Sequence, residues 1–420
     1  METIKIKPSP LSGRVNIPPS KSAAHRNIIC AALSLGRSVI SPICHSEDID
    51  ATISACKALG AVITEEENCF IIEGIDKSKL IGKRVNIDCG ESGSTLRFMI
   101  PIAASLGCKA TFIGHGRLPK RPITPITEAI SNKGVVCSGD SLPLTVSGKL
   151  LAGEYSISGD VSSQYLTGLL FAIGLNGGSV RLTTPLESAG YVALTIEILK
   201  HFGVTIYEKN GVYSAKGHFK PTTATIEGDW SQACFYLAAG ALGGELELSG
   251  LNFNSSQGDI KAIELFKKFG ANITVKDGIL YVKPSELKGQ NIDCSQIPDM
   301  VPALAVTAAL SQGKTTIFGG SRLRLKETDR IKTVIAGLQA MGITATETPD
   351  GMVITGGSPV GGTVDGSGDH RIVMAFSVLA AFSEGSTKIE GYTSVNKSYP
   401  NFFEDFKSIG GRADGIISWR

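Results

Sequence analysis

Cationic side chains occur at several positions where the sequence predicts the first turn of a helix. A cation there opposes the helix dipole and is mildly destabilising unless an anion binds. Free backbone N–H groups, the dipole and a nearby cation together form an anion site. Simple capping explains any one of these starts, and it is the preferred interpretation for Asp229. The repeated combination predicts binding of small anions. The cations are Lys21, Arg26, Arg97 and Arg371, and the starts read Pro19-Ser20-Lys21-Ser22, Gly90-Glu91-Ser92-Gly93-Ser94, Asp160-Val161-Ser162-Ser163-Gln164, Asp229-Trp230-Ser231-Gln232, Ile297-Pro298-Asp299 and Gly368-Asp369-His370-Arg371.

A second set of polar residues lies in other predicted helix starts. The pair Arg121-Pro122 indicates a helix with proline at its first position. Ser188 and Tyr191 lie at another start. In residues 326–330 (KETDR), helical spacing brings the charged side chains near one face. A solvated ladder of salt bridges is the ordinary alternative for such a run. Lys397 precedes the last predicted helix, where a solvated lysine is the default expectation.

The elements that must position these residues repeat along the whole chain. A helix-like segment, a glycine and a β-branched strand recur six times at intervals of 67 to 74 residues. A second series, an Ala/Leu-rich helix followed by glycine and a strand, has the same period of about 70 residues. We expect each of these glycines to be the left-handed cap of the helix before it. The alternation predicts the α/β class, and six units suit two three-unit domains, divided near residues 210–230, better than an extended solenoid. The glycines are Gly60, Gly134, Gly203, Gly270, Gly342 and Gly410, then Gly36, Gly107, Gly178, Gly244, Gly313 and Gly385.

The composition excludes several classes of function. The 41 Lys+Arg and 39 Asp+Glu leave a net charge of +2, which gives no basic footprint for nucleic acid. The longest strongly apolar runs, such as Val373 to Phe382, are too short to span a bilayer, and the N-terminus lacks a secretory signal. Nine cysteines without a Cys-x-x-Cys pair predict neither a disulfide framework nor a zinc site. We therefore expect a cytoplasmic protein in which Cys30, Cys56 and Cys234 are core residues.

Eight motifs, taken in order, resemble those of the EPSP synthase (3-phosphoshikimate 1-carboxyvinyltransferase) family. They extend from Ser20 to Phe403 and read PSKSAAHR, GESGSTLR, KRPI, SSQYLTGLL, IPD, LKETDR, GDHR and NKSYPNFF. The resemblance implies two similar domains, each made of three βαβαββ repeats in an inside-out α/β barrel. It also implies that residues 1–19 and 228–420 form one discontinuous domain and that residues 20–227 form a domain inserted into it.

The same resemblance implies an activity. Enzymes of the family transfer the enolpyruvyl group of phosphoenolpyruvate to the 5-hydroxyl of shikimate 3-phosphate and release phosphate through a non-covalent tetrahedral ketal. This reaction of the shikimate pathway leads to chorismate and the aromatic amino acids. Both substrates carry a phosphate and a carboxylate, which Arg contacts in a bidentate manner and Lys as a point charge. We expect no cofactor, no metal, no nucleic-acid or membrane partner, and a monomer.

The resemblance assigns roles to individual residues. Asp299 is the candidate base for the 5-hydroxyl, Glu327 is the candidate acid for the methylene carbon, and Lys21 contacts both ligands. Which of the three transfers which proton stays open, because their pKa values depend on burial and neighbours. The residues implied for shikimate 3-phosphate are Lys21, Ser22, Arg26, Ser162, Ser163, Gln164, Ser188, Tyr191, Asp299 and Lys326. Those implied for phosphoenolpyruvate are Lys21, Gly93, Arg121, Gln164, Arg330, Arg371 and Lys397, with His370 in a supporting role.

Three positions depart from the common pattern of the family. Glu91 stands where Asn is frequent, Ser94 where Thr is usual, and Arg322 at a position that is often Asn or Glu-like. A carboxylate at position 91, beside an anion site, should weaken anion binding unless it points away or pairs with a neighbour. We expect these departures to affect affinity and the response to inhibitors such as glyphosate.

Two other functions remain as alternatives. The sister enzymes that transfer enolpyruvyl to UDP-N-acetylglucosamine usually carry a Cys in the loop before the Arg-Pro pair, and residues 116–121 here contain none. A non-catalytic repeat protein that only binds anions is the second alternative. Asp299 and Glu327 argue against it, because anion binding gains nothing from carboxylates.

Overall fold

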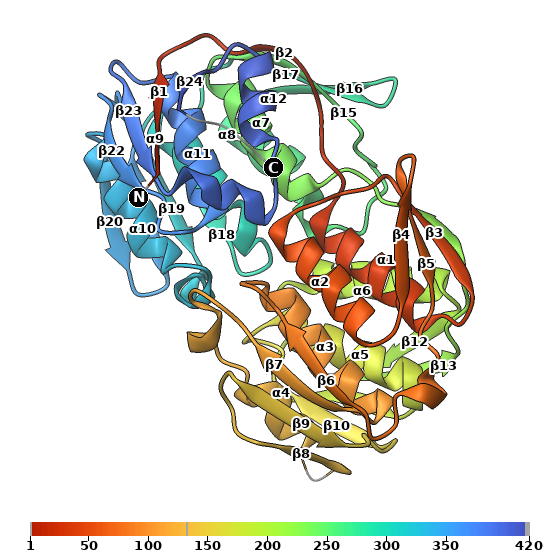
Figure 1. The fold of residues 1–420 in the computed structure, drawn as a ribbon. Coiled ribbons are helices and arrows are strands. Elements are labelled where there is room, and N and C mark those ends of the chain that lie inside the picture. The colour runs from red at the N-terminus through yellow and green to blue at the C-terminus, as the bar shows by residue number, and fades with distance from the viewer. Residues whose placement is uncertain (1, 132, 416–420) are drawn as a thin grey trace. The chain divides into compact units, whose positions relative to one another are not determined.

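The chain divides into two compact units, each with its own buried apolar cluster. The structure is a computed structural model that describes residues 2–131 and 133–415 (Figure 1). Unit 1 consists of Met1–Pro18 and Gly228–Arg420, and unit 2 of Pro19–Glu227. Within the described residues, none of the helices has the length and apolar character needed to cross a membrane.

The βαβαββ repeat occurs within unit 2 in an uninterrupted form. The chain runs from β6 (Arg84–Asp88) through α3 (Gly93–Leu106) to β7 (Lys109–Ile113), and then through α4 (Thr124–Ile130) to β8 (Val135–Cys137) and β9 (Leu144–Gly148). The strand order is β6-β7-β9-β8. Strands β6 and β7 are parallel and the other pairs are antiparallel. The parallel pair requires a crossover, which α3 provides.

The same plan recurs in the other repeats of unit 2. The next repeat comprises β10 (Glu154–Ile157), α5 (Ser163–Asn176), β11 (Ser179–Leu182), α6 (Ala189–His201), β12 (Val204–Lys209) and β13 (Val212–Gly217). The remaining one comprises α1 (Lys21–Leu33), β3 (Arg37–Ser41), α2 (Glu47–Ala58), β4 (Val62–Glu66) and β5 (Cys69–Glu73). Its first strand is β14 (Thr223–Thr225), which comes from the end of the unit and pairs in parallel with β3.

Unit 1 contains three more repeats, two of which use the N-terminal strands. Strand β2 (Ser12–Asn16) opens the repeat α7 (Trp230–Leu242), β15 (Glu245–Ser249), α8 (Ala262–Phe269), β16 (Asn272–Lys276) and β17 (Ile279–Lys283). The second comprises β18 (Asn291–Asp293), α9 (Val301–Ala309), β19 (Lys314–Phe318), α10 (Arg330–Ala340), β20 (Thr344–Thr348) and β21 (Gly351–Thr355). The third comprises β22 (Gly362–Asp365), α11 (His370–Ala381), β23 (Thr387–Glu390), α12 (Phe402–Ser408) and β24 (Arg412–Asp414), and β1 (Thr3–Lys7) completes it.

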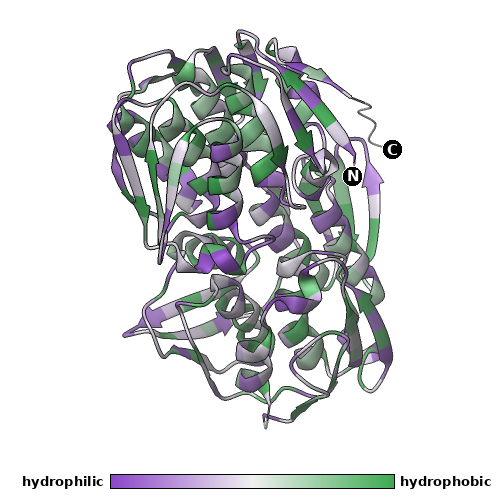
Figure 2. Cartoon of the chain, turned by 90° about the vertical axis from the view of Figure 1, so that its left-hand side faces the viewer, coloured by the Kyte–Doolittle hydropathy of each residue, from purple (hydrophilic) through white to green (hydrophobic). Residues whose placement is uncertain are grey.

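All six four-stranded sheets therefore share one order, in which the fourth strand of the repeat lies between the second and the third. The predicted α/β class and six repeats are confirmed. The third repeat of unit 1 is not contiguous in the sequence, because its fourth strand is β1, which lies between β23 and β24 (Figure 1). Buried and exposed residues alternate along some strands, such as β6, and Figure 2 shows hydrophilic and hydrophobic segments within the strands.

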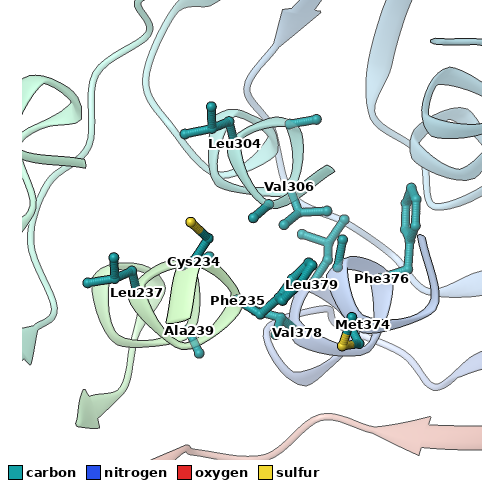
Figure 3. Close-up of a cluster of buried hydrophobic side chains, with 14 of the residues drawn as sticks. Cys234, Phe235, Leu237, Ala239, Leu304, Val306, Met374, Phe376, Val378 and Leu379 are labelled. Atoms are coloured by element: carbon teal, nitrogen blue, oxygen red, sulfur yellow. The ribbon is translucent and has the colours of Figure 1, made fainter. Parts of the chain in front are cut away.

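The Ala/Leu-rich segments form the buried central helices. In α7, α9 and α11 of unit 1, all or nearly all residues are buried. Figure 3 shows Phe235, Val306 and Leu379, one from each helix, pointing toward one another. A helix that is apolar on all sides needs neighbours on all sides. Helices α1, α3 and α5 are the equivalents in unit 2. The predicted burial of Cys30, Cys56 and Cys234 is confirmed.

The expectation that the repeated glycines are left-handed caps is confirmed for most of them. All six glycines of the first series have positive φ, as do four of the second series. Gly244 and Gly385 do not, so that expectation is wrong for these two. There a Cβ would lie 2.8 Å from the Leu11 carbonyl oxygen and 2.5 Å from that of Val360, respectively. Close backbone approach, rather than a left-handed turn, explains these two glycines.

We predict that Gly168→Ala destabilises unit 2. A Cβ at Gly168 of α5 would overlap the carbonyl oxygen of Arg97 and lie 3.0 Å from Pro101 Cγ, both in α3. The helices must separate, which costs about 1–3 kcal/mol and exceeds the roughly 1 kcal/mol of helix propensity that Ala gains. Urea unfolding measures the change. Gly139→Ala is the control, because no atom lies within 4 Å of its Cβ position and the site is exposed; equal stability of the two variants would contradict the prediction.

Candidate functional site

In unit 2, capping serines set the starts of the three central helices. The side chains of Ser20, Ser92 and Ser162 accept hydrogen bonds from backbone N–H groups of the first turns of α1, α3 and α5. Helix α1 therefore begins at Lys21, as predicted. Arg26 and Arg97 lie in second turns, so their placement in first turns is wrong. Because of these serine caps, α1 begins five residues before Arg26 and α3 begins four residues before Arg97.

Lys21 is paired within its own unit. Its Nζ lies 2.7 Å from the Asp48 carboxylate in the first turn of α2, and both side chains are mostly buried. One turn along α1, His25 Nδ1 lies 2.7 Å from Thr52 Oγ1. Burial, with the charges of Lys21 and Arg26, lowers the pKa of His25 well below its ordinary value. His25 is therefore neutral at pH 7.

A chain of hydroxyl groups continues from Thr52. Its Oγ1 lies 2.7 Å from Thr95 Oγ1, which in turn donates to Ser92 Oγ at 2.8 Å. These residues belong to α2, α3 and the cap of α3. The chain fixes the starts of α1 and α3 against α2, because each buried hydroxyl would lose a hydrogen bond if one helix moved.

Arg26 is a buried cation whose hydrogen bonds go to neutral oxygens. Nε donates to Thr195 Oγ1 at 2.8 Å, Nη1 to the Ser22 carbonyl at 2.7 Å and Nη2 to the Tyr191 carbonyl at 3.2 Å. Burial lowers the pKa of Arg26 to about 10, so it stays charged at neutral pH. The structure thus brings the predicted residues Ser22, Arg26 and Tyr191 together. Ser188 precedes α6 in a left-handed conformation (φ 55°) and does not cap it.

A second cluster surrounds the start of α3. Gln164 of α5 accepts from Arg97 Nη1 at 2.8 Å and donates to Ser94 Oγ at 2.9 Å. A Cβ at Gly93 would lie 2.7 Å from Arg97 Nη1 and 2.8 Å from Arg121 Nη1. Two guanidinium groups therefore rest against the first residue of the helix. Sequence analysis placed Arg97 near this helix start but assigned it to no substrate. The spacing of four residues between Gly93 and Arg97 is the signal that could have made the assignment.

The predicted helix start at Arg121-Pro122 is wrong. Arg121 follows the short helix η2 (Leu118–Lys120) in an extended conformation, and α4 begins at Thr124 with Pro125 in its first turn. A residue before proline is pushed toward extended geometry. The second proline, rather than the first, therefore lies in the helix.

In unit 1, Arg330 joins three carboxylates. Its Nε donates to Asp369 at 2.7 Å, Nη1 to Asp299 at 2.8 Å and Nη2 to Glu327 at 2.9 Å. The side chain is 1% exposed. Burial alone lowers the pKa of Arg330, but Asp369, Glu327 and Asp299 outweigh it and raise the pKa above its ordinary value. The predicted alternative of a solvated salt-bridge ladder is therefore wrong.

The segment before α10 also differs from the prediction. Lys326 and Glu327 precede the helix, which begins at Arg330 behind the cap of Asp329. They do not share a helix face, because the cap and the preceding short helix η5 (Ser321–Leu325) leave residues 326–329 between two helices. Arg330 and Lys326 nevertheless meet at Asp299, to which Lys326 Nζ donates at 3.2 Å.

Burial lowers the pKa of Lys326, and Asp299 only partly restores it. Arg322, one of the three departures, donates to the Ser295 carbonyl at 2.6 Å and adds a positive charge near Lys326. Asp299 itself lies in a short helix, η4 (Pro298–Met300), rather than in the first turn of α9 as predicted. Pro302 lies in the first turn of α9, and α9 begins at Val301.

The start of α11 completes this group of charges. Asp369 caps α11 through the Arg371 N–H, and Arg371 Nη2 donates to Asp299 at 3.3 Å. His370 and Arg371 are buried in the first turn. Lys397, at the end of η6 (Tyr392–Lys397), donates to the Gly368 carbonyl at 2.9 Å and is 9% exposed, so it is not the solvated lysine of the default expectation. Asp299, Glu327 and Asp369 therefore lie among four cations, Lys326, Arg330, Arg371 and Lys397.

Asp259 lies behind this group and was missed by sequence reasoning. It follows Gln257-Gly258 in the short helix η3 (Gly258–Lys261), is 3% exposed, and accepts a hydrogen bond from Ser231 of α7. Burial raises the pKa of Asp259 to about 6, and the negative charges of Asp299 and Asp229 add to this against the opposing effect of Arg371. Ionisation of Asp259 would place a further negative charge close to Asp299 and Asp229.

We predict that Asp259 makes unit 1 less stable as pH rises. A carboxyl whose pKa is raised by folding stabilises the fold below about pH 4, and this contribution is lost as pH rises through about 6. Raising the pKa of Asp259 from 3.8 to about 6 corresponds to about 3 kcal/mol of unfolding free energy. Between pH 4 and pH 7.5, the unfolding free energy of Asp259→Asn minus that of the wild type should rise by about that amount.

Urea unfolding at several pH values measures this difference. Asp277→Asn, in the exposed turn between β16 and β17, is the control. A difference that does not change with pH would show that folding does not raise the pKa of Asp259.

Comparisons with known proteins agree with these observations. The family model of EPSP synthase (3-phosphoshikimate 1-carboxyvinyltransferase) matches residues 5–406. A 3-phosphoshikimate 1-carboxyvinyltransferase of Clostridium kluyveri is 43% identical over 422 residues, which cover 99% of each chain. One of Clostridium novyi is 44% identical over 429 residues, again 99% of each chain.

Solved structures show the same fold. EPSP synthase of Acinetobacter baumannii has a TM-score of 0.82 and 26% identity, over 99% of this chain and all of that one. The enolpyruvyl transferase NikO of Streptomyces tendae has a TM-score of 0.80 at 16% identity over the full length of both chains, a likeness of fold alone. Within the described residues there is no cluster of three or more His, Cys, Asp or Glu residues with metal-binding geometry. Two domains of three repeats, the ordered motifs and these matches show that the chain belongs to the EPSP synthase (3-phosphoshikimate 1-carboxyvinyltransferase) family.

Proposed function

We propose that this chain transfers the enolpyruvyl group of phosphoenolpyruvate to the 5-hydroxyl of shikimate 3-phosphate and releases phosphate. Membership of the family supports the reaction. One observation carries the assignment of residues: the buried Arg330 holds Glu327 and Asp299 in fixed positions, on separate nitrogens. The reaction needs two such groups, one to accept a proton and one to supply a proton.

Two steps account for the products. In the addition, the 5-hydroxyl oxygen bonds to C2 of phosphoenolpyruvate, the hydroxyl proton goes to a base, and C3 receives a proton from an acid. In the elimination, the bond from C2 to the phosphate oxygen breaks, and phosphate leaves with the electron pair. C3 then returns a proton, which restores the double bond. We assign the carbon proton to Glu327, which must be protonated when phosphoenolpyruvate is bound, and the hydroxyl proton to Asp299.

Lys326 supports Asp299 in this assignment. Three cations, Lys326, Arg330 and Arg371, contact the Asp299 carboxylate at 2.8 to 3.3 Å. Lys326 Nζ lies 3.2 Å from Asp299, and burial lowers its pKa toward the range of a useful base. The pair can therefore share the proton of the 5-hydroxyl.

Different cations bind each of the two anionic substrates. Arg26, with Ser22, binds the carboxylate of shikimate 3-phosphate, and Tyr191 its ring. The phosphate of shikimate 3-phosphate is held by Ser162, Ser163 and Ser188. Phosphoenolpyruvate is bound by Gly93, Arg121, Arg330, Arg371 and Lys397, with His370 beside them, while Lys21 and Gln164 contact both substrates. The neutral partners of Arg26 support its part, because a buried charge without a carboxylate partner is stabilised when an anion arrives.

We further propose a monomeric protein of the cytoplasm. All nine cysteines are free thiols, which suits a reducing compartment. The reaction belongs to the shikimate pathway, which leads through chorismate to the aromatic amino acids. A coupled assay that follows phosphate release tests the function directly, since release must require both substrates together. Release from phosphoenolpyruvate alone, or no release with both, would reject the function.

Glu327→Gln should lower kcat by about 100-fold, because the amide cannot supply the proton while it keeps the shape of the side chain. Steady-state kinetics measure kcat, and the melting temperature should fall further than in the control, because the buried Arg330 loses one of its three carboxylates. Glu347→Gln is that control, since Glu347 also pairs with an arginine, Arg324, at 2.6 Å but lies outside the cluster. A kcat for Glu327→Gln within threefold of the wild type would remove Glu327 from proton transfer.

Arg26→Gln should raise KM for shikimate 3-phosphate by about 10- to 100-fold, the equivalent of one charge-assisted hydrogen bond. KM for phosphoenolpyruvate should change much less. The ligand-free protein should be no less stable than the wild type, because the variant removes a buried cation that has neutral partners. Arg181→Gln, at an exposed pair with Glu154, is the control. A stability loss without any change in KM would make Arg26 a structural residue.

A further inference from the structure

We propose that Glu91 is a positioning residue that fixes the Arg121 loop (residues 114–121) to the start of α3. It does so by occupying the space that a side chain at Gly116 would need. The proposal rests on the proposed function only for the substrate that Arg121 binds. Position 91 is also where the sequence departs from the Asn frequent in the family, and the carboxylate was expected to disturb an anion site.

The Glu91 carboxyl group lies directly against Gly116. All three of its atoms, Cδ, Oε1 and Oε2, lie 2.6 Å or less from the position of a Cβ at residue 116, and they are the three nearest atoms. Gly116 also has a positive φ of 55°, which other residues adopt at a cost. Glycine at 116 thus admits the carboxyl group as well as the turn.

Backbone hydrogen bonds join the same two segments on either side of this contact. Cys89 N–H donates to the Ile113 carbonyl at 2.9 Å, and His115 N–H donates to the Gly90 carbonyl at 2.7 Å. The loop then turns through Leu118, which is buried, and Arg121 N–H donates to the Leu118 carbonyl at 3.1 Å. Residues 89–91 therefore hold the first part of the segment that leads from β7 to Arg121.

The segment that leads from β7 to Arg121 ends at the start of α3. The Arg121 guanidinium lies against Gly93, with Cζ 3.1 Å and Nη1 2.8 Å from the Cβ position there. Glu91 is two residues before Gly93 and touches the loop that carries Arg121. A shift of the loop would move the guanidinium away from the N–H groups of the first turn of α3, which the proposed function assigns to phosphoenolpyruvate.

The position of the carboxyl group also bears on the expectation that Glu91 weakens anion binding unless it points away from the site or pairs with a neighbour. Glu91 faces Gly116, and its charge adds to that of Asp88, the main cause of the raised pKa of His115. His115 Nε2 lies 2.9 Å from Asp88. The Glu91 carboxyl group therefore lies against the loop and adds to the negative charge near its histidine.

Four variants test the proposal by steady-state kinetics. Glu91→Ala and Gly116→Ala should each raise KM for phosphoenolpyruvate about 10-fold, the loss of one well-aligned charge-assisted hydrogen bond, while kcat and KM for shikimate 3-phosphate stay within about threefold. Glu91→Gln keeps the shape and should also stay within about threefold of the wild type. Gly82→Ala is the control for positive φ, because Gly82 has a φ of 73° with no atom within 4 Å of its Cβ position; its KM values should not change.

The double variant separates a shared contact from two independent effects. In Glu91→Ala/Gly116→Ala, the methyl group of residue 116 enters the space that the carboxyl group left. KM for phosphoenolpyruvate should therefore match that of a single variant, about 10-fold above the wild type, rather than the product of about 100-fold. A 100-fold rise would overturn the proposal, as would an equal rise in KM for both substrates. A fall in KM for Glu91→Gln would do so as well, because it would make Glu91 a repelling charge.

Hydrogen exchange gives a readout that does not depend on activity. Amides of residues 114–121, including that of His115, should exchange faster in Glu91→Ala and Gly116→Ala than in the wild type, and at the wild-type rate in Gly82→Ala. Unchanged exchange in both single variants would overturn the proposal. If the wild type lacked transferase activity, the proposed function would fail, but the exchange of these amides would still decide whether Glu91 fixes the loop.

Discussion

A parallel pair of strands constrains where every candidate residue can lie. In each repeat the first two strands are parallel, and the chain must cross between them through a buried helix. That helix begins beyond the carboxyl end of the first strand, the place where α/β proteins bind ligands. Asp299 follows β18, Arg371 follows β22 and Gly93 follows β6. The repeat thus delivers helix starts to one end of each unit, and the side chains there become neighbours.

The two units stabilise their buried charges in different ways. In unit 1, the buried charge of Arg330 is offset by three carboxylates. Removing any one member would leave a buried charge without its partner, which is costly. In unit 2, Arg26 relies on carbonyl and hydroxyl oxygens. Unit 1 is therefore organised before a ligand binds, whereas the Arg26 site gains most from an incoming anion.

The sequence predicted local features well and contacts between distant segments poorly. Period, fold class and most helix starts follow from glycines and capping serines, which act within a few residues. The Arg330 cluster joins Asp299, Glu327 and Asp369, and only the fold brings Asp299 and Asp369 to Arg330. Asp259 and the contact of Glu91 with Gly116 were missed for the same reason. Three helix starts, predicted at Arg121, Asp299 and Lys326, were wrong, because several prolines and capping residues lie close together there and sequence alone does not decide which of them begins the helix.

The order of the strands has a consequence for synthesis on the ribosome. The first strand to be made, β1, lies between β23 and β24, which are among the last. Residues 3–7 must wait without a partner until residues 387–414 have emerged, while the three sheets of unit 2 need nothing beyond residue 225. Domains generally fold as units during translation. The inserted unit can thus be complete halfway through translation, whereas the unit that contains both ends of the chain is the last to close.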